Sequence, residues 1–540
     1  MAIGLWLQRC TPGVSSLMVI FLVTFSESFL IIYTLFIHLV ISAMPLRIFR
    51  GARLATQQMR AALEASQQEM DEPENSSASS HNPTSPGLIH VCIIPSYKES
   101  SETLHDTLRI LASHRLAKST YDVFLAMEER DPNAIAVAEA LVSKFSPSFL
   151  DIQYCLHPSD IPGESLGKSA NVAWTAREVE EKYLGRPNFK DVLVTIMDSD
   201  THLLGTYFSL IQRRHLELRA QSDLSATTLY CAPIVFDRNS HQVPRLVRAA
   251  DMGWSCSGLA CFKRPDDHHG IVFPTSVYTL PLSLASAVGG WDTGPGAIGE
   301  DMHMMLKCYF ATNGHLNIES IASPASMSNV TSAGTGWSGW VQDHKARYFQ
   351  GLRHMWGCLD SGYAVARWYQ MGSSPLAGNK VTRPNMEEDG KKARRSSPGD
   401  ETVEVRASKG GFLWLRNAVL FLRLFEAHIL PLHISCILVA SSYYSSHLNS
   451  STSSPYLETA LRITEYARTV NGIFMAICLT TVYADFHKAC VERAVESGGY
   501  SGHSWPACYK YGIWDFAIVT GSGIAFLDGQ STVSGEWKAC

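Results

Sequence analysis

The sequence has no Cys-x-x-Cys pair among its 13 cysteines, so it lacks the spacing typical of structural zinc sites and thioredoxin-like redox sites. The cysteines are scattered through polar and apolar stretches of a 540-residue chain, and we expect buried, reduced thiols rather than a disulfide framework. An excess of charge of one sign is also missing, because 45 Lys and Arg residues face 50 Asp and Glu residues, a net charge of -5. A nucleic-acid partner, which requires a strongly basic face, is therefore not expected.

Long apolar runs are absent from the middle of the chain and occur at its two ends. The run from Leu17 to Met44 exceeds the roughly 20 residues that span a bilayer, and it is too long for the apolar region of a cleaved signal peptide. Pro45 ends this run; four arginines follow between residues 47 and 60, whereas only Arg9 precedes it. Because positive charge marks the cytosolic flank, we expect the chain after Pro45 to be cytosolic.

The C-terminal part contains several further membrane segments. Residues 412–425 are typical of a helix in the membrane interface, while 428–444 and 470–486 are long enough to span. The stretch 511–527 contains Asp515 and is either a fourth span or interfacial. Of three Asn-x-Ser/Thr motifs, only the one at Asn449 is expected to face the lumen. We expect a multi-pass protein in contact with membrane lipids, in an endomembrane or the plasma membrane, with a cytosolic catalytic domain.

The middle of the chain alternates short β-rich runs with helical stretches, which predicts an α/β domain with a largely parallel sheet. The chain divides into five expected regions: 1–50 an N-terminal transmembrane segment, 51–87 a flexible linker, 88–372 the globular domain, 373–409 a disordered insert, and 410–540 interfacial and transmembrane helices with a tail.

Polar side chains follow several of the predicted strands. The run from Val91 ends in a turn that carries Pro95, Tyr97 and Glu99, and ligands of open α/β sheets bind beyond such strand ends. Further on, Gly163-Glu-Ser-Leu-Gly-Lys168 precedes a predicted helix, where Lys168 is placed to neutralise a phosphate. A surface loop with an isolated lysine is the alternative reading.

Two carboxylates, Asp198 and Asp200, come directly after the apolar run 192–197. Isolated buried carboxylates are unfavourable, so such a pair faces solvent or a cation, and hard oxygen ligands suit Mg2+ or Mn2+. The sequence therefore predicts a divalent metal at this strand end.

A second acidic pair, Glu300 and Asp301, opens a predicted helix. These residues are suited to cap the helix, but Asp301 is also suited to act as a general base on a hydroxyl group. Arg347 and Tyr348 follow in a cationic and aromatic stretch, where an arginine can clamp phosphate and a tyrosine can stack on a sugar ring.

In this order, the motifs resemble those of the family 2 glycosyltransferases, especially the membrane-bound branch with cellulose synthase, chitin synthase, hyaluronan synthase and ceramide glucosyltransferase. The resemblance covers roughly residues 88–372 and the flanking membrane segments. It implies a GT-A fold, a nucleotide-diphosphate sugar as donor, with a UDP-sugar favoured, Mg2+ or Mn2+ as cofactor, and inversion at the anomeric carbon.

The resemblance also implies roles for single residues. Asp301 matches the general base, and Asp198 and Asp200 match the metal-binding D-x-D motif. The implied substrate-binding residues are Pro95, Tyr97, Glu99, Glu128, Lys168, Asn171, Asp198, Glu300, Arg347 and Tyr348. Glu129 and Asp131 are alternatives to Glu128 as the acidic contact to the base or ribose. The family's Q-x-x-R-W motif is matched imperfectly, because His344 and Tyr348 replace its first and last residues, which leaves the acceptor type and processivity open.

We therefore expect an inverting hexosyltransferase that acts on a lipid, small hydrophobic or polysaccharide acceptor at a membrane. Two alternatives stay open. A membrane-bound nucleotidyltransferase shares the α/β core and the carboxylate-bound metal but does not need Asp301 as a lone base. An inactive glycosyltransferase-like scaffold is disfavoured because Asp198, Asp200 and Asp301 are all present.

Overall fold

The computed structural model describes residues 27–71, 88–186, 189–240, 242–332, 334, 336–373, 413–431 and 455–496. The predicted insert, the proposed segment 511–527 and most of 428–444 lie outside the described residues, as do residues 72–87.

A seven-stranded sheet forms the centre of the domain, in the order β3-β2-β1-β4-β7-β5-β8. Its neighbours pair in parallel except at β7, which is antiparallel to β4 and to β5. The prediction of an α/β domain with a mostly parallel sheet is thus confirmed. The strands are β1 (Ile89–Ser96), β2 (Tyr121–Glu128), β3 (Asp151–His157), β4 (Val192–Ile196), β5 (Thr228–Cys231), β7 (Tyr278–Pro281) and β8 (Asn317–Ser320), with β6 (Ile234–Phe236) and β9 (Ala325–Met327) in a separate pair.

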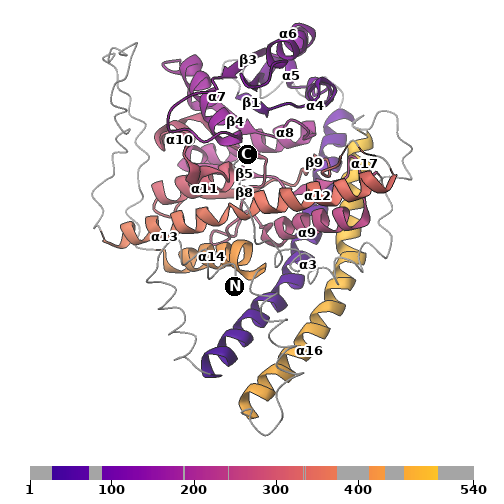
Figure 1. Cartoon of the computed structure of the whole chain (residues 1–540). Coiled ribbons are helices and arrows are strands. Elements are labelled where there is room, and N and C mark those ends of the chain that lie inside the picture. Colours follow the sequence, from indigo (N-terminus) through magenta and orange to yellow (C-terminus); the bar gives the residue numbers. More distant parts are fainter. Residues whose placement is uncertain are drawn as a thin grey trace.

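Helices cover both faces of this sheet (Figure 1). They are α4 (Ser101–Ala112), α5 (Ala117–Thr120), α6 (Ala134–Phe145), α7 (Lys168–Tyr183), α8 (Gly205–Gln221), α9 (Arg245–Cys261), α10 (Leu282–Ala287), α11 (Glu300–Ala311), α12 (Gly336–Met355) and α13 (Cys358–Ser373). Single turns of 3-10 helix are η1 (Ser146–Ser148), η2 (Phe189–Asp191), η3 (Asp223–Thr227) and η4 (Pro295–Ala297).

The strand β1 explains why both faces are covered. Its side chains alternate between two cores, with Val91 and Ile93 packed among residues of α7 and α11, and Cys92 and Ile94 packed among residues of α4 and α8. A parallel strand buried on both faces reads as a continuous apolar run, which is how it appears in the sequence.

The remaining described helices are α3 (Glu27–Asp71), α14 (Trp414–Leu424), α16 (Pro455–Cys478) and α17 (Ala484–Glu496), with π-helical turns η5 (Phe425–Ile429) and η6 (Leu479–Tyr483). In Figure 1, α3 and α16 leave the sheet domain on one side and project away from it. Two described stretches, Ile31–Ala62 and Pro455–Arg493, are long and apolar enough to cross a membrane by length and composition.

The structure departs from the expected linker at its start. The helix α3 continues through Pro45 to Asp71, so residues 51–71 are helical rather than linker, and Pro45 does not end the helix. The physical reason is tertiary packing, because Ala52, Ala55 and Met59 are buried against Cys256 and other residues of α9, η6 and α17. Burial of this face outweighs the local helix-breaking tendency of proline.

Candidate active site

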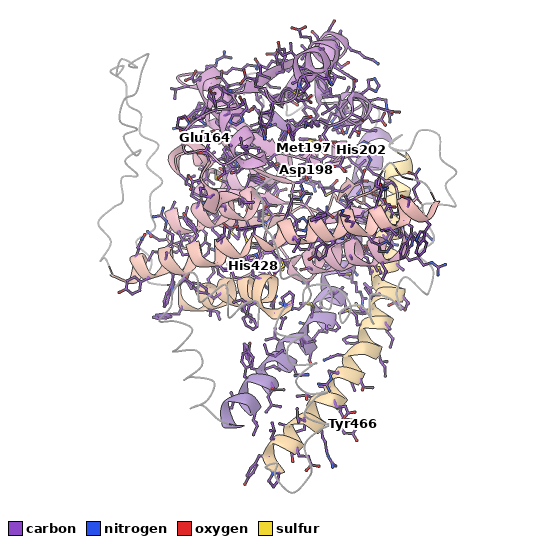
Figure 2. The ribbon with its side chains drawn as sticks, in the orientation of Figure 1. Glu164, Met197, Asp198, His202, His428 and Tyr466 are labelled. Carbon is purple, nitrogen blue, oxygen red and sulfur yellow. The ribbon has the colours of Figure 1, made fainter. Side chains whose placement is uncertain are left out.

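Three carboxylates gather where β1 and β4 end side by side. The two strands are parallel neighbours, so the loops after Ser96 and Ile196 leave the sheet at the same edge. Glu99 follows β1, and Asp198 and Asp200 follow β4. Figure 2 labels Asp198 with its chain neighbours Met197 and His202 in the region of the sheet domain.

The carboxylates repel one another. The pKa of Asp200 is raised mainly by burial and next by the negative charge of Asp198. The pKa of Glu99 is also raised, mainly by burial and next by the charges of Asp200 and Asp198. Arg238 donates a hydrogen bond to the Asp200 carbonyl oxygen, and the Ser328 amide donates to Asp200 Oδ2 at 3.3 Å. Negative charge at this edge therefore favours a cation.

Lys168 supplies one positive charge. It begins α7 after Gly167, whose φ of 145° is a backbone conformation that favours glycine. Its Nζ lies 2.7 Å from Asp198 Oδ1 and 3.1 Å from Glu300 Oε2. Burial lowers the pKa of Lys168, but Asp198, Glu300 and Asp301 raise it more, so the ammonium group is charged.

Asp301 is held by backbone amides. The Ser276 amide donates to Asp301 Oδ2 at 2.7 Å, and the Met302 amide donates to Oδ1 at 2.8 Å. Ser276 has a positive φ of 60°, an uncommon conformation for a residue other than glycine. Strained backbone at this point brings the loop before β7 against the start of α11 and fixes the orientation of the Asp301 carboxylate.

Behind Asp301, Glu300 takes part in a buried chain of hydrogen bonds. Trp291 Nε1 donates to the Tyr278 hydroxyl at 2.7 Å, and this hydroxyl donates to Glu300 Oε1 at 2.5 Å. Burial raises the pKa of Glu300 to about 7, with Lys168 opposing and Asp301 adding to the shift. These hydrogen bonds fix the position of the Glu300 carboxylate and, through its ion pair with Lys168, the position of the Lys168 ammonium group. Nothing in the sequence pattern singled out Tyr278, since its role depends on the antiparallel pairing of β7 with β4.

A second cluster lies at the ends of β1 and β2. Arg130 lies over the Tyr97 ring, 4.5 Å from its centroid, and its Nε donates to Glu128 Oε2 at 3.0 Å. Tyr97 is 41% exposed whereas Glu128 is buried. The alternatives to Glu128 have other contacts, since Glu129 accepts from the Ser159 amide and Asp131 accepts from the Lys98 amide. Arg130 was not predicted, although its position two residues after Glu128 was the available signal.

Other predicted site residues have structural contacts. Asn171 Nδ2 donates to the Ala126 carbonyl oxygen at 2.7 Å and joins α7 to β2, and Pro95 lies within β1 opposite Ala126. Arg347 is buried and pairs with Asp251 of α9, with Nη2 and Oδ1 3.1 Å apart. Its neighbour Tyr348 packs edge-to-face on Phe349. The structure thus brings Lys168, Asp198, Glu300 and Asp301 together, and it brings Arg347 to Asp251 rather than to Lys168.

A further network joins α11 to α13. His303 Nδ1 lies 2.7 Å from Asp360 Oδ1, and its Nε2 lies 3.0 Å from Asp292 Oδ2. Ser169 next to Lys168 donates to the Asp292 carbonyl oxygen at 2.6 Å. The loop at Asp292 therefore links the starts of α7 and α11, which carry Lys168 and Asp301.

The carboxylates fit a divalent cation in chemistry, since Asp198 and Asp200 offer hard oxygen ligands at a crowded, negatively charged strand end. Within the ranges that the structure describes, no three His, Cys, Asp or Glu side chains, Glu99, Asp198 and Asp200 included, are positioned to hold one metal ion together.

Comparison with known proteins identifies a family. The sequence model of glycosyl transferase family group 2 matches residues 193–484, more than half of the chain. None of the curated proteins matches the chain.

Several solved structures are similar to the chain at low identity. A mannosyltransferase from Pyrobaculum calidifontis in complex with GDP-Man and Mn2+ has 12% identity and a TM-score of 0.40, with 85% of this chain and 99% of that chain covered. Glucosyl-3-phosphoglycerate synthase from Mycobacterium tuberculosis with Mn2+, UDP-glucose and phosphoglyceric acid has 12% identity and a TM-score of 0.29, covering 54% and 82%. S. aureus TarS has 11% identity and a TM-score of 0.28, covering 53% and 44%.

Proposed function

The chain belongs to glycosyl transferase family group 2 and is a glycosyltransferase, and from this premise we propose that it transfers a sugar from a nucleotide-diphosphate sugar, favourably a UDP-sugar, to an acceptor at a membrane with inversion at the anomeric carbon. The observation that carries the proposal is the convergence of Lys168, Asp198, Glu300 and Asp301 from three separate segments. Next to them lies Asp200, whose carboxylate adds to the negative charge.

The residues divide into three tasks. Tyr97 offers an exposed ring for a nucleobase, and Glu128 with Arg130 offers polar groups to its edge. Lys168 neutralises the diphosphate. Asp198 and Asp200 would hold Mg2+ or Mn2+, which when bound supplies electrostatic stabilisation of the leaving nucleoside diphosphate.

Asp301 acts as the general base. Its two amide hydrogen bonds hold the carboxylate in one orientation, so a free lone pair can accept the proton of the acceptor hydroxyl. The acceptor oxygen then attacks the anomeric carbon from the face opposite the diphosphate. This direct displacement needs one base, in contrast to the two-carboxylate arrangement of glycoside hydrolases. Arg347 is engaged by Asp251, so a contact between Arg347 and the diphosphate would require that ion pair to open.

The membrane location rests on the two candidate spans and on α14. The helix α14 buries Arg416, which donates to the Gly314 and Leu316 carbonyl oxygens, while Trp414 and Leu415 are exposed. An amphipathic helix with exposed aromatic and aliphatic side chains suits the membrane interface. We propose that α3 and α16 cross the bilayer and that 88–372 is the cytosolic catalytic domain.

The test is release of nucleoside diphosphate by the full-length protein in detergent, with UDP- and GDP-sugars, Mn2+ or Mg2+ and membrane lipid extract. We expect metal-dependent turnover of one donor, with Asp301→Asn and Asp200→Ala each lowering kcat about 100-fold or more because the base or a metal ligand is lost. Glu217→Gln, which changes an exposed carboxylate on α8 outside the cluster, is the matched control.

Each result has a distinct meaning. Turnover that persists in Asp301→Asn would favour the nucleotidyltransferase alternative, which does not require this base. Lack of turnover with every donor and acceptor would favour the inactive scaffold and contradict the proposal.

A further inference from the structure

The loop between β3 and α7, residues 158–167, is tied to both of these elements by Glu164. Glu164 Oε2 lies 3.0 Å from Nε2 of His157, the last residue of β3, and Arg177 of α7 donates to Glu164 Oε1 at 3.0 Å. Figure 2 labels Glu164 near the place of α7 in Figure 1. The carboxylate therefore joins the two elements that the loop connects.

Two glycines give the backbone of this loop freedom. Gly163 has a φ of 81° and Gly167 a φ of 145°, and a Cβ placed on either would meet no atom within 4 Å. Between them, the Ser165 amide donates to the Thr293 carbonyl oxygen at 2.7 Å. The proposed phosphate-binding lysine follows directly after the loop, so its position depends on how the loop is held.

His157 also faces the cluster at the ends of β1 and β2. It is the register partner of Glu128 in the parallel pair of β2 and β3, and its Nδ1 lies 3.9 Å from Glu128 Oε2. Both side chains are buried, and His157 Nδ1 has no hydrogen-bond partner among the described residues. The same Glu128 oxygen accepts from Arg130 Nε at 3.0 Å. One imidazole thus stands between a carboxylate of the proposed base site and the carboxylate that holds the loop.

A nucleobase would change the contacts of Arg130. The guanidinium carbon lies 4.5 Å from the centroid of the Tyr97 ring, on which a base would stack. A base in this place draws Arg130 to its own edge and away from Glu128. The Glu128 carboxylate then lacks that donor, and His157 Nδ1 is close enough to replace it after a small side-chain rotation. An imidazole that donates to two carboxylates is positively charged, and such hydrogen bonds are stronger than neutral ones.

We propose that His157 is a positioning residue that makes binding of the nucleobase and binding of the diphosphate cooperative. This inference rests on the proposed function and deepens it, because it links two parts of the same donor site. A base fixes Glu128, Glu128 fixes the imidazole, and the imidazole fixes Glu164. The loop then holds Lys168 where the diphosphate meets it. Because the base orders a loop that the diphosphate otherwise has to order, each raises the affinity for the other by the same factor.

A purely structural role of His157 makes a different prediction. The imidazole packs beside Trp174 of α7, with ring centroids 6.0 Å apart, so its loss affects packing as well. Weakened packing lowers the stability of the fold and weakens binding of the base and of the diphosphate independently. It does not change the factor by which one raises the affinity for the other, and this factor is therefore the readout.

The test measures the Kd of pyrophosphate with Mg2+ by calorimetry on the full-length protein in detergent, without a nucleoside and with a saturating concentration of one. Uridine and guanosine are both used, and the nucleoside of the donor that the protein turns over is the one that should couple. In the unaltered protein we expect this nucleoside to lower the pyrophosphate Kd about fivefold, a usual size for coupling between two sites.

Two variants remove the link at different places. His157→Phe keeps a ring but removes both nitrogens, and Glu164→Ala removes the carboxylate on the loop. In each, the nucleoside should leave the pyrophosphate Kd unchanged. Glu164→Ala should also raise the donor KM about tenfold while kcat at saturating donor stays within about twofold, because the bound donor then orders the loop itself. His215→Phe, which replaces an equally buried imidazole on α8, is the matched control and should keep the coupling.

The outcomes separate this inference from the proposed function. Donor turnover without coupling in the unaltered protein overturns the inference and leaves the proposed function intact. Coupling that persists in either His157→Phe or Glu164→Ala likewise overturns it. Coupling without turnover of any donor supports the linked site and contradicts the proposed transfer. Lack of turnover together with lack of binding by pyrophosphate and both nucleosides removes the two proposals together.

Discussion

At the scale of the residue, His303 shows how the site is held rather than how it reacts. The imidazole lies between Asp292 and Asp360, and its side chain is 7% exposed. Burial lowers the pKa of His303, but hydrogen bonds to the two carboxylates raise it more, to about 9. A charged imidazole between two carboxylates ties α11, which starts with Glu300 and Asp301, to α13.

The raised pKa gives a prediction for stability against pH. Because the pKa is higher in the folded protein than the usual value of 6.5, His303 stabilises the fold fully below pH 6.5, and the stabilisation is lost as pH rises through about 9. We expect His303→Gln to lower Tm at pH 6.5 by on the order of 2–4 °C or more, and to lower it little at pH 9.5. Thermal unfolding in detergent at the two pH values measures this.

His268→Gln, on an exposed loop, is the control and should leave both Tm values unchanged. Equal losses of Tm at pH 6.5 and pH 9.5 in His303→Gln would show that the side chain acts through packing alone.

Single residues also show which parts of the candidate site the sequence predicts and which it does not. The sequence placed Glu99 after one strand and Asp198 and Asp200 after another, and the three lie at one edge because the carboxyl ends of adjacent parallel strands meet there. Ser276, Tyr278 and Asp360 were missed, because their contacts with Asp301, Glu300 and His303 arise from packing between distant segments. Whether the predicted residues bind substrate stays a prediction.

At the scale of the element, α3 is the feature that the sequence described least well. Pro45 and the polar residues after it indicated that the helix ends and that a linker follows, whereas the helix continues to Asp71. The deciding contact is a close crossing of α3 and α9 at Gly51. A Cβ at this position would lie 1.8 Å from the Leu259 carbonyl oxygen and 2.8 Å from its carbonyl carbon. Only glycine allows the two backbones this distance.

We expect Gly51→Ala to separate α3 from α9 and to lower the free energy of unfolding by about 1–3 kcal/mol, because neither backbone can move without losing the buried contacts around it. Chemical denaturation in detergent measures the change. Gly258→Ala, on α9 next to Leu259 with open space at its Cβ, is the control. A Gly51→Ala protein as stable as the control would contradict a close crossing.

At the scale of the whole molecule, the directions of the helices constrain the path of the chain. Ser42 bonds with Asn471 and His38 with Arg468, so residue numbers rise together and α3 and α16 run in the same direction. The segment around η5 packs on the same stretch of α3, since Glu426 pairs with Arg47, Phe425 lies against Phe36 and Leu430 packs near Ile37. If both α3 and α16 cross the bilayer, the chain between them must cross back, as expected for the predicted span 428–444.

This path places the connection before α16 on the side opposite the catalytic domain, which gives a prediction about glycosylation. We expect Asn449, which lies outside the described residues, to carry an N-glycan when the protein is made in eukaryotic cells. Endoglycosidase treatment should increase the gel mobility of the unaltered protein and not that of Asn449→Gln.

Two comparisons make the result specific. Asn75→Gln, on the side expected to be cytosolic, should keep the glycan. Asn329 is buried and donates to Asp251 at 2.6 Å, so it is no acceptor in the folded domain. A glycan on Asn75 instead of Asn449 would reverse the proposed orientation.

The ion pair between Lys168 and Asp198 has a consequence for the order in which ligands bind. The ammonium group already stands 2.7 Å from a carboxylate oxygen that a divalent metal would need, so a metal arriving alone competes with it. If Lys168 binds the diphosphate as proposed, a nucleotide sugar would draw the ammonium group away and release that oxygen. Metal and nucleotide sugar would then be linked ligands, and each would raise the affinity for the other by the same factor, as thermodynamic reciprocity requires. In the proposed site the lysine would therefore be an internal counter-ion that makes binding of the two cooperative.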